Sequence, residues 1–155
     1  MQKIIFMIFL NSVALIFAAC TQKAAQPDIQ IENVWSRPVK IAEVPSDGNS
    51  GSNGVVYMSI ANKGRVADRL IAASADVCEA TEVHRTIVAD NRMSMQKVEN
   101  GVEIPAGTIV AFEPGGFHIM LLNLRQSLQT GDRFSVEMQF EKSGLKKVES
   151  TVKLQ

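Results

Sequence analysis

The chain is poor in the residues that most catalytic and metal-binding sites use. Its 155 residues include two histidines, two cysteines, one tryptophan and one tyrosine. The two cysteines, Cys20 and Cys78, lie far apart and form no CxxC pair, which argues against thiol–disulfide exchange. No nucleophile and general base occur at a recognisable spacing, so the sequence does not indicate an enzyme.

Charge of neither sign is in excess. Sixteen basic side chains balance 16 acidic ones, for a formal net charge of +0 at pH 7. Binding to nucleic acid or to an anionic membrane surface usually requires a basic surface. The composition therefore argues against nucleic acid as a partner and against a polybasic membrane contact.

The longest apolar run lies at the N-terminus, from Ile4 to Ala19. It is short for a membrane span and has the length of a signal-peptide core. Small residues lead from it into Cys20, as in bacterial lipoprotein signals, so we expect cleavage after residue 19 and lipid on the Cys20 thiol. Ordinary secretion, with cleavage near Ala19 or Ala25, is the alternative.

These signals predict a location and a division of the chain. Residues 1–19 are expected to be a lipoprotein signal peptide, residues 20–28 a lipid-anchored tether, and residues 29–155 a single domain. Thr21, where an aspartate would retain a lipoprotein in the inner membrane, favours the outer membrane of a Gram-negative cell. With ordinary secretion the protein would instead be soluble in the periplasm.

Short alternating segments separated by turn residues indicate strands from residue 29 onward. We expect them at about 29–35, 55–61, 68–74, 77–88, 92–98, 108–113, 117–122, 132–141 and 144–153. Residues 41–54 are rich in Gly, Ser, Asn and Asp and predict a mobile loop, and residues 123–129 could hold one helical turn. With no convincing amphipathic helix, the pattern predicts an all-β, antiparallel sandwich or barrel.

Both histidines are spaced closely with methionines. Ten residues separate His84 from Met95, and one residue separates His118 from Met120. If a hairpin turns near residues 89–91, His84 and Met95 share a face, either directly opposite or two residues apart, because strand side chains alternate. His118 and Met120 share a face for the same reason. The sequence thus predicts two donor pairs held on strands.

Imidazole and thioether groups are soft, neutral donors, and this set favours copper, above all Cu(I), while leaving Cu(II) open. Thioethers cannot be lost to disulfide formation, so they suit an oxidising compartment. Each imidazole must be neutral to bind, so affinity should fall as the pH drops through about 6.5. Such a site can hold Cu(I) while a partner exchanges ligands one by one.

The remaining sulfur-containing side chains have other expected roles. Met93 shares a face with Met95 and is a candidate additional metal ligand, whereas Met58 and Met138 are expected in the core. Cys78 could add a soft ligand, but a buried packing role is favoured. A blue-copper electron-transfer site needs a cysteine beside two histidines, and no cysteine lies near His118.

These residues resemble the periplasmic copper chaperone family PCu(A)C, which carries H-x10-M-x21-H-x-M on a cupredoxin-like Greek-key β-sandwich. The matching stretches are Val34–Pro38, Gly54–Tyr57, Ala67–Leu70, Glu82–His84, Met93–Met95, Ile104–Gly107 and Pro114–Leu121. The resemblance implies that fold, and implies that the copper ligands are His84, Met95, His118 and Met120.

The chain departs from the family pattern at two places. Arg85 stands where the family often has Met, which removes a potential donor. The gap from Met95 to His118 holds 22 residues rather than 21, and we expect the turn at residues 99–101 to absorb the extra one. A lipid anchor is also unusual for the family and favours delivery to a membrane-bound acceptor.

The resemblance implies a non-enzymatic metallochaperone. It would hold Cu(I) in the periplasm and exchange it with a donor or acceptor protein, such as the copper centre of cytochrome c oxidase or its assembly factors. One alternative is a copper-buffering or resistance lipoprotein without a dedicated acceptor. Another is a structural β-sandwich lipoprotein that binds no metal.

Overall fold

The computed structural model describes residues 24–41, 51–89 and 92–155. Within these ranges the regular structure is all β: ten strands and no helix, and therefore no helix that could cross a membrane. The strands are β1 (Ile29–Ser36), β2 (Gly54–Asn62), β3 (Asp68–Ala75), β4 (Cys78–Ala89), β5 (Arg92–Lys97), β6 (Val102–Ile104), β7 (Ile109–Phe112), β8 (Phe117–Leu124), β9 (Arg133–Phe140) and β10 (Gly144–Val152).

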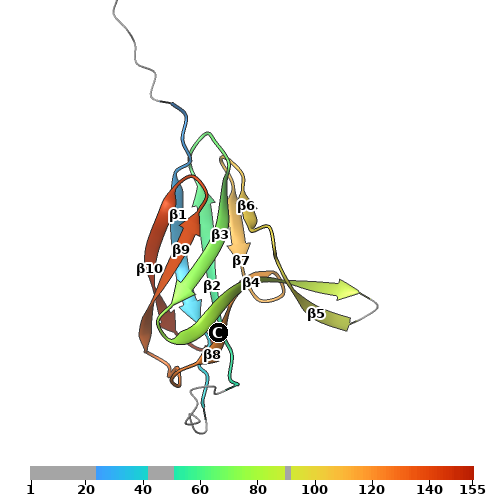
Figure 1. Ribbon diagram of the computed structural model, residues 1–155, viewed down its shortest axis with the longest axis vertical. Coiled ribbons are helices and arrows are strands. Elements are labelled where there is room, and N and C mark those ends of the chain that lie inside the picture. Colours follow the sequence, from blue (N-terminus) through green and yellow to red (C-terminus); the bar gives the residue numbers. More distant parts are fainter. Residues whose placement is uncertain (1–23, 42–50, 90–91) are drawn as a thin grey trace, which may run out of the picture.

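The strands form one sheet in the order β5-β4-β8-β7-β2-β1-β10-β9-β3-β6, with an additional β8–β2 pairing. The sheet folds over on itself, as Figure 1 shows, so that side chains from both halves meet in a single buried cluster. Ile60 and Ile119 enter this core from one half, and Val136 and Phe140 enter it from the other. The predicted all-β sandwich is confirmed.

The sheet is mixed rather than wholly antiparallel, which corrects one detail of the prediction. β7 and β8 both run antiparallel to β2 along successive parts of it, so they are parallel to each other where Phe112 pairs with Phe117. β1 and β10, the first and last strands, are also parallel, with Trp35 opposite Thr151. Neither pairing is a local hairpin, and sequence alternation carries no information on such contacts.

Two further differences have local causes. β6 was not predicted, because three residues are too few for a periodicity, yet Val102 and Ile104 are buried against the core. The helical turn considered for residues 123–129 is absent: Leu128 is buried and pairs with Val39, and the Ser127 hydroxyl accepts a hydrogen bond from the backbone of Ile41. Most of the loop predicted at 41–54 lies outside the described residues.

The buried methionines behave as expected for core residues. Met58 is 2% exposed and Met138 is fully buried, and both belong to the main apolar cluster. The expected core role of these two thioethers is therefore confirmed, and neither is available as a surface ligand.

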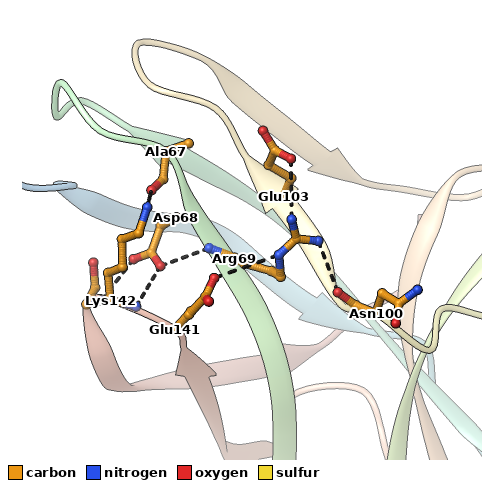
Figure 2. Close-up of polar contacts among 8 residues, drawn as sticks. Ala67, Asp68, Arg69, Asn100, Glu103, Glu141 and Lys142 are labelled. Atoms are coloured by element: carbon orange, nitrogen blue, oxygen red, sulfur yellow. Dashed lines mark hydrogen bonds and ion pairs between the residues drawn. The ribbon is translucent and has the colours of Figure 1, made fainter.

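Asp68 is a buried carboxylate that fastens one end of the sandwich (Figure 2). It accepts backbone hydrogen bonds from Arg69 at 2.8 Å, Lys142 at 2.9 Å and Ser143 at 2.9 Å, which join the start of β3 to the β9–β10 turn. Burial acts to raise the pKa of Asp68, but hydrogen bonds from Ser143, Lys142 and Arg69 outweigh it, so the pKa is lowered. The carboxylate is therefore held in its charged form.

Among the described residues, those just before β1 already contact the domain. The carbonyl of Gln26 accepts a hydrogen bond from Arg65, and that of Asp28 accepts one from Lys63. The chain passes so close to Gly64 that a Cβ there would lie 2.4 Å from the Gln26 oxygen, so only glycine fits. The end of the predicted tether is thus docked on the β2–β3 turn, while Cys20 lies outside the described residues.

Candidate metal centre

Strands β4 and β5 form a hairpin that projects from the body of the sandwich (Figure 1). Thr86 lies opposite Met95, and His84 lies opposite Lys97. This is the second of the two registers that the sequence allowed. His84 and Met95 therefore share one face of the hairpin and are offset by two residues, a separation that long side chains can span.

Strand β8 pairs with the other edge of β4 and brings the second donor pair to the same face. His118 lies directly opposite His84, and Met120 lies directly opposite Glu82. The two imidazole ring centroids are 5.9 Å apart, at an interplanar angle of 51°. β4 is thus the strand shared by both pairs, a neighbourhood that the sequence did not predict because residues 84 and 118 are distant along the chain.

The four predicted ligands differ in exposure. His118 is 2% exposed, and His84 and Met120 are half-buried in the β4–β8 wall. Met95 is 61% exposed on β5, and Met93, the candidate additional ligand, is 70% exposed one step further along that face. Three of the donors thus lie in the wall formed by β4 and β8, and the exposed methionines of β5 lie on the strand beside it.

Each histidine uses one ring nitrogen in a hydrogen bond and leaves the other free. His84 Nε2 lies 2.8 Å from a Glu82 carboxylate oxygen, and His118 Nδ1 lies 3.2 Å from the Gly116 carbonyl oxygen. Carboxylate and carbonyl oxygens accept, so these nitrogens carry the protons when the rings are neutral. The remaining atoms, His84 Nδ1 and His118 Nε2, are buried without a hydrogen-bond partner.

Unpartnered buried acceptors are unfavourable and call for an explanation. Two of them on opposite residues of β4 and β8, with Met120 two residues from His118 on the same face of β8, are an arrangement that a soft metal ion would satisfy. Burial is the main cause that lowers the pKa of His118; the hydrogen bond to the Gly116 carbonyl partly opposes it, and the electrostatic effect of the neighbouring His84 lowers it further. The buried imidazole therefore favours the neutral form that metal binding requires.

An aromatic stack supports His118 on the side away from His84. The Tyr57 ring lies 6.3 Å from the His118 ring, and Trp35 packs on Tyr57 at 4.7 Å between centroids. The Arg37 guanidinium lies 5.7 Å from the centre of the Tyr57 ring. Trp35 is the chain's only tryptophan, so its fluorescence is a built-in reporter close to the candidate site.

Cys78 does not belong to this site. Its thiol is buried in the core, 3.6 Å from the Ala75 carbonyl oxygen, and burial raises its pKa. It lies six residues before His84, about 20 Å along the strand. Cys78 and His84 are an even number of residues apart, so simple alternation would place them on the same face. The alternation does not hold here, because Leu124, the β8 partner of Cys78, follows Asn123, whose φ of 52° interrupts the regular strand. The favoured packing role is confirmed.

Sequence reasoning missed two charged neighbours of the histidines. Glu82 contacts His84, and Lys97 places its ammonium 3.0 Å from the other Glu82 oxygen. Simple alternation along β4 and β5 places both on the same face as His84, so the sequence pattern could have predicted that they are neighbours of the site. Among the described residues, no three His, Cys, Asp or Glu side chains are grouped to hold a metal ion. A metal centre here therefore depends on the thioethers.

Comparison with known proteins identifies the relatives of this chain. The model of the family described as "Putative lipoprotein LpqE-like" matches residues 29–152. A lipoprotein of Leifsonia xyli subsp. xyli, named as putative, is 28% identical over 125 residues, covering 81% of this chain and 69% of the relative. A protein of Rickettsia prowazekii is 27% identical over 117 residues, covering 76% and 62% respectively. The chain thus spans about two thirds of the length of these curated relatives.

Solved structures share the fold. The copper-bound PCuAC domain from PmoF2 matches with a TM-score of 0.63 and 23% identity, over 82% of this chain and 93% of that domain. The Cu(I) form of DR1885 from Deinococcus radiodurans matches with a TM-score of 0.53 and 20% identity, over 79% and 78% of the two chains. At these identities the likeness shows a PCuAC-type, cupredoxin-like fold. With its family model covering almost the whole described domain, the chain belongs to the LpqE-like family.

Proposed function

We propose that the protein binds one Cu(I) ion through His84, His118, Met120 and Met95 and passes it to a partner protein. The observation that carries the proposal is the facing pair of histidines, 5.9 Å apart, each with one buried ring nitrogen that has no partner. Met120 extends from the same wall and Met95 from the adjoining hairpin edge. Two imidazoles and two thioethers form a soft, uncharged donor set, which Cu(I) prefers.

The solved relatives support copper as the cargo. One is a copper-bound PCuAC domain and another a Cu(I)-bound protein, and both share this fold. The donor set of this chain contains no thiolate, because Cys78 is in the core. A blue Cu(II) centre is therefore not proposed, and adding Cu(II) should not produce a blue protein.

Carriage and release are proposed from the unequal exposure of the donors. The two histidines and Met120 would retain the ion while Met95, which is 61% exposed, is the donor that an incoming ligand reaches first. Stepwise replacement of neutral ligands avoids an unligated ion at any stage. We propose a membrane-bound acceptor, with the copper centre of cytochrome c oxidase or its assembly factors as the first to be tested.

We further propose that Cys20 is lipidated and anchors the protein on the periplasmic side of a membrane, with the outer membrane favoured. The support is the sequence before Cys20 and the lipoprotein descriptions of the family and of the Leifsonia relative. Metabolic labelling with a fatty-acid analogue should mark the wild-type protein and leave Cys20→Ala unmarked. Labelling of neither would indicate ordinary secretion.

A competition titration tests the copper site. Residues 21–155 would be titrated with Cu(I) against a chromophoric chelator, with Trp35 fluorescence as a second signal. We expect one tight equivalent in the wild type and none in the double variant His84→Ala/His118→Ala. Met58→Leu, which removes a core thioether, is the control and should keep the tight equivalent. A folded wild-type domain that does not compete would leave a structural sandwich and end the copper proposal.

A buffering or resistance role would use the same site without a dedicated acceptor. A strain lacking the gene separates the two, because loss of a chaperone should lower oxidase activity at limiting copper and be rescued by added copper. Loss of a buffer should instead lower survival at excess copper and leave oxidase activity unchanged.

A further inference from the structure

Glu82 occupies a central position among the candidate ligands without being one of them. It lies two residues before His84 on β4 and directly opposite Met120 on β8. One carboxylate oxygen is 2.8 Å from His84 Nε2, and the other is 3.0 Å from Lys97 Nζ on β5. Glu82 therefore links the wall of the site to the hairpin that carries Met95.

The carboxylate constrains the His84 ring in a specific way. An ionised carboxylate can only accept hydrogen bonds, so a neutral His84 must donate its Nε2 proton to Glu82. The lone pair available to a metal is then on Nδ1, which is buried and has no other partner. A bond between a ligating histidine and a carboxylate commonly fixes the tautomer and the ring orientation and strengthens the metal–nitrogen bond.

We propose that Glu82 is a positioning residue for the copper site: it holds the His84 ring by Nε2, so that the buried and unpartnered Nδ1 remains available to the ion. This inference rests on the proposed Cu(I) function. Glu82 itself does not contact the ion. Its effect is to keep one donor in place before copper arrives, so that less ordering is required on binding.

Lys97 keeps the carboxylate in position. It lies opposite His84 across the β4–β5 pair and shares a face with Met95, two residues earlier on β5. Its second contact, to Glu99, is longer at 3.9 Å. A partly exposed ion pair adds little stability, so the main effect of Lys97 is to orient Glu82 and, through it, to relate the hairpin to the wall.

The test measures the metal-free protein first and copper second. In nitrogen-15 NMR of wild-type protein, the His84 Nε2 proton should exchange slowly with water and give a resolved signal. Glu82→Ala should lose that signal, whereas Glu82→Gln should keep it, because the amide oxygen can still accept the proton. Glu79→Ala is the control: it removes the same charge from the same strand, at an exposed residue that contacts Asn123 instead.

Cu(I) affinity gives the second readout. Glu82→Ala should weaken binding by about ten- to a hundredfold, the usual effect of losing a partner behind a metal ligand. Glu82→Gln should recover most of that loss, Lys97→Gln should cost less than Glu82→Ala, and Glu79→Ala should stay within about twofold of wild type.

Three results would overturn the inference: an unchanged His84 ring proton in Glu82→Ala, an unchanged Cu(I) affinity in that variant, or an equal loss of affinity in Glu79→Ala, which would indicate a charge effect alone. Failure of the proposed function itself looks different. The wild type would then show the bonded His84 proton in the metal-free state but would not bind Cu(I) at all.

Discussion

The sandwich body and the β4–β5 hairpin hold their side chains in different ways. In the body, apolar side chains from both halves of the sheet pack into a single core. The body also holds a buried charged group, Asp68, with three backbone hydrogen bonds. All six residues of β5, by contrast, are exposed. The candidate copper site lies on the boundary, with His118 and Met120 in the body and Met95 on the hairpin. In the proposed function, the body would retain the ion and the hairpin would release it.

The largest expected effect comes from weakening the body away from the site. Asp68→Asn replaces one of the two carboxylate oxygens with an NH2 group, which cannot accept a hydrogen bond from the backbone N–H groups that now surround it. We expect a loss of about 1–3 kcal/mol in the free energy of unfolding at pH 7, measured by urea denaturation. Cu(I) affinity should stay within about twofold, and a larger change would mean that body and site are coupled.

The same substitution has a pH signature. Because the pKa of Asp68 in the folded protein lies below its ordinary value of 3.8, the stabilisation is complete above that value and is lost as the pH falls through the folded pKa. The stability difference between wild type and Asp68→Asn should therefore shrink when unfolding is measured at pH 3 instead of pH 7. A difference that stays constant would exclude a role for the charge.

The next effect concerns the thioether on the body side of the boundary. Met120→Leu removes the sulfur while nearly keeping the volume, so the fold should be retained. Met120 is half-buried on β8 and needs little ordering on binding, so we expect a loss of about thirtyfold in Cu(I) affinity, or about 2 kcal/mol. Chelator competition measures it. If Met120→Leu lost less Cu(I) affinity than Met95→Leu, the hairpin and not the body would hold the ion more tightly.

The sequence predicted the local parts of this site better than the distant ones. Alternation placed His84 with Met95 and His118 with Met120, and the observed hairpin register is one of the two considered. It could not place β8 beside β4, because the pairing that brings His84 opposite His118, 34 positions further along the chain, depends on the global fold. Nor could alternation foresee the irregularity at Asn123 that leaves Cys78 in the core.

The matched substitution on the hairpin should have a smaller equilibrium effect and a larger kinetic one. Met95 is 61% exposed, so fixing its side chain on the ion offsets part of the energy gained. We expect Met95→Leu to lower Cu(I) affinity by about tenfold, or about 1.4 kcal/mol, and to speed release to a chelator in stopped-flow measurements. If the variant releases Cu(I) as slowly as the wild type, Met95 is not the ligand that is exchanged first.

The smallest effect is expected at Met93, which shares a strand, a face and a side-chain type with Met95. Met93 pairs with Val88, whereas Met95 pairs with Thr86, so Met93 lies one step further from His84 and is 70% exposed. Reaching the ion would require the hairpin to bend toward the wall. Met93→Leu should therefore leave Cu(I) affinity within about twofold of wild type. If its affinity instead falls by as much as that of Met95→Leu, the two methionines alternate as ligands, and the exposed edge of the hairpin is a shared path along which copper leaves the site.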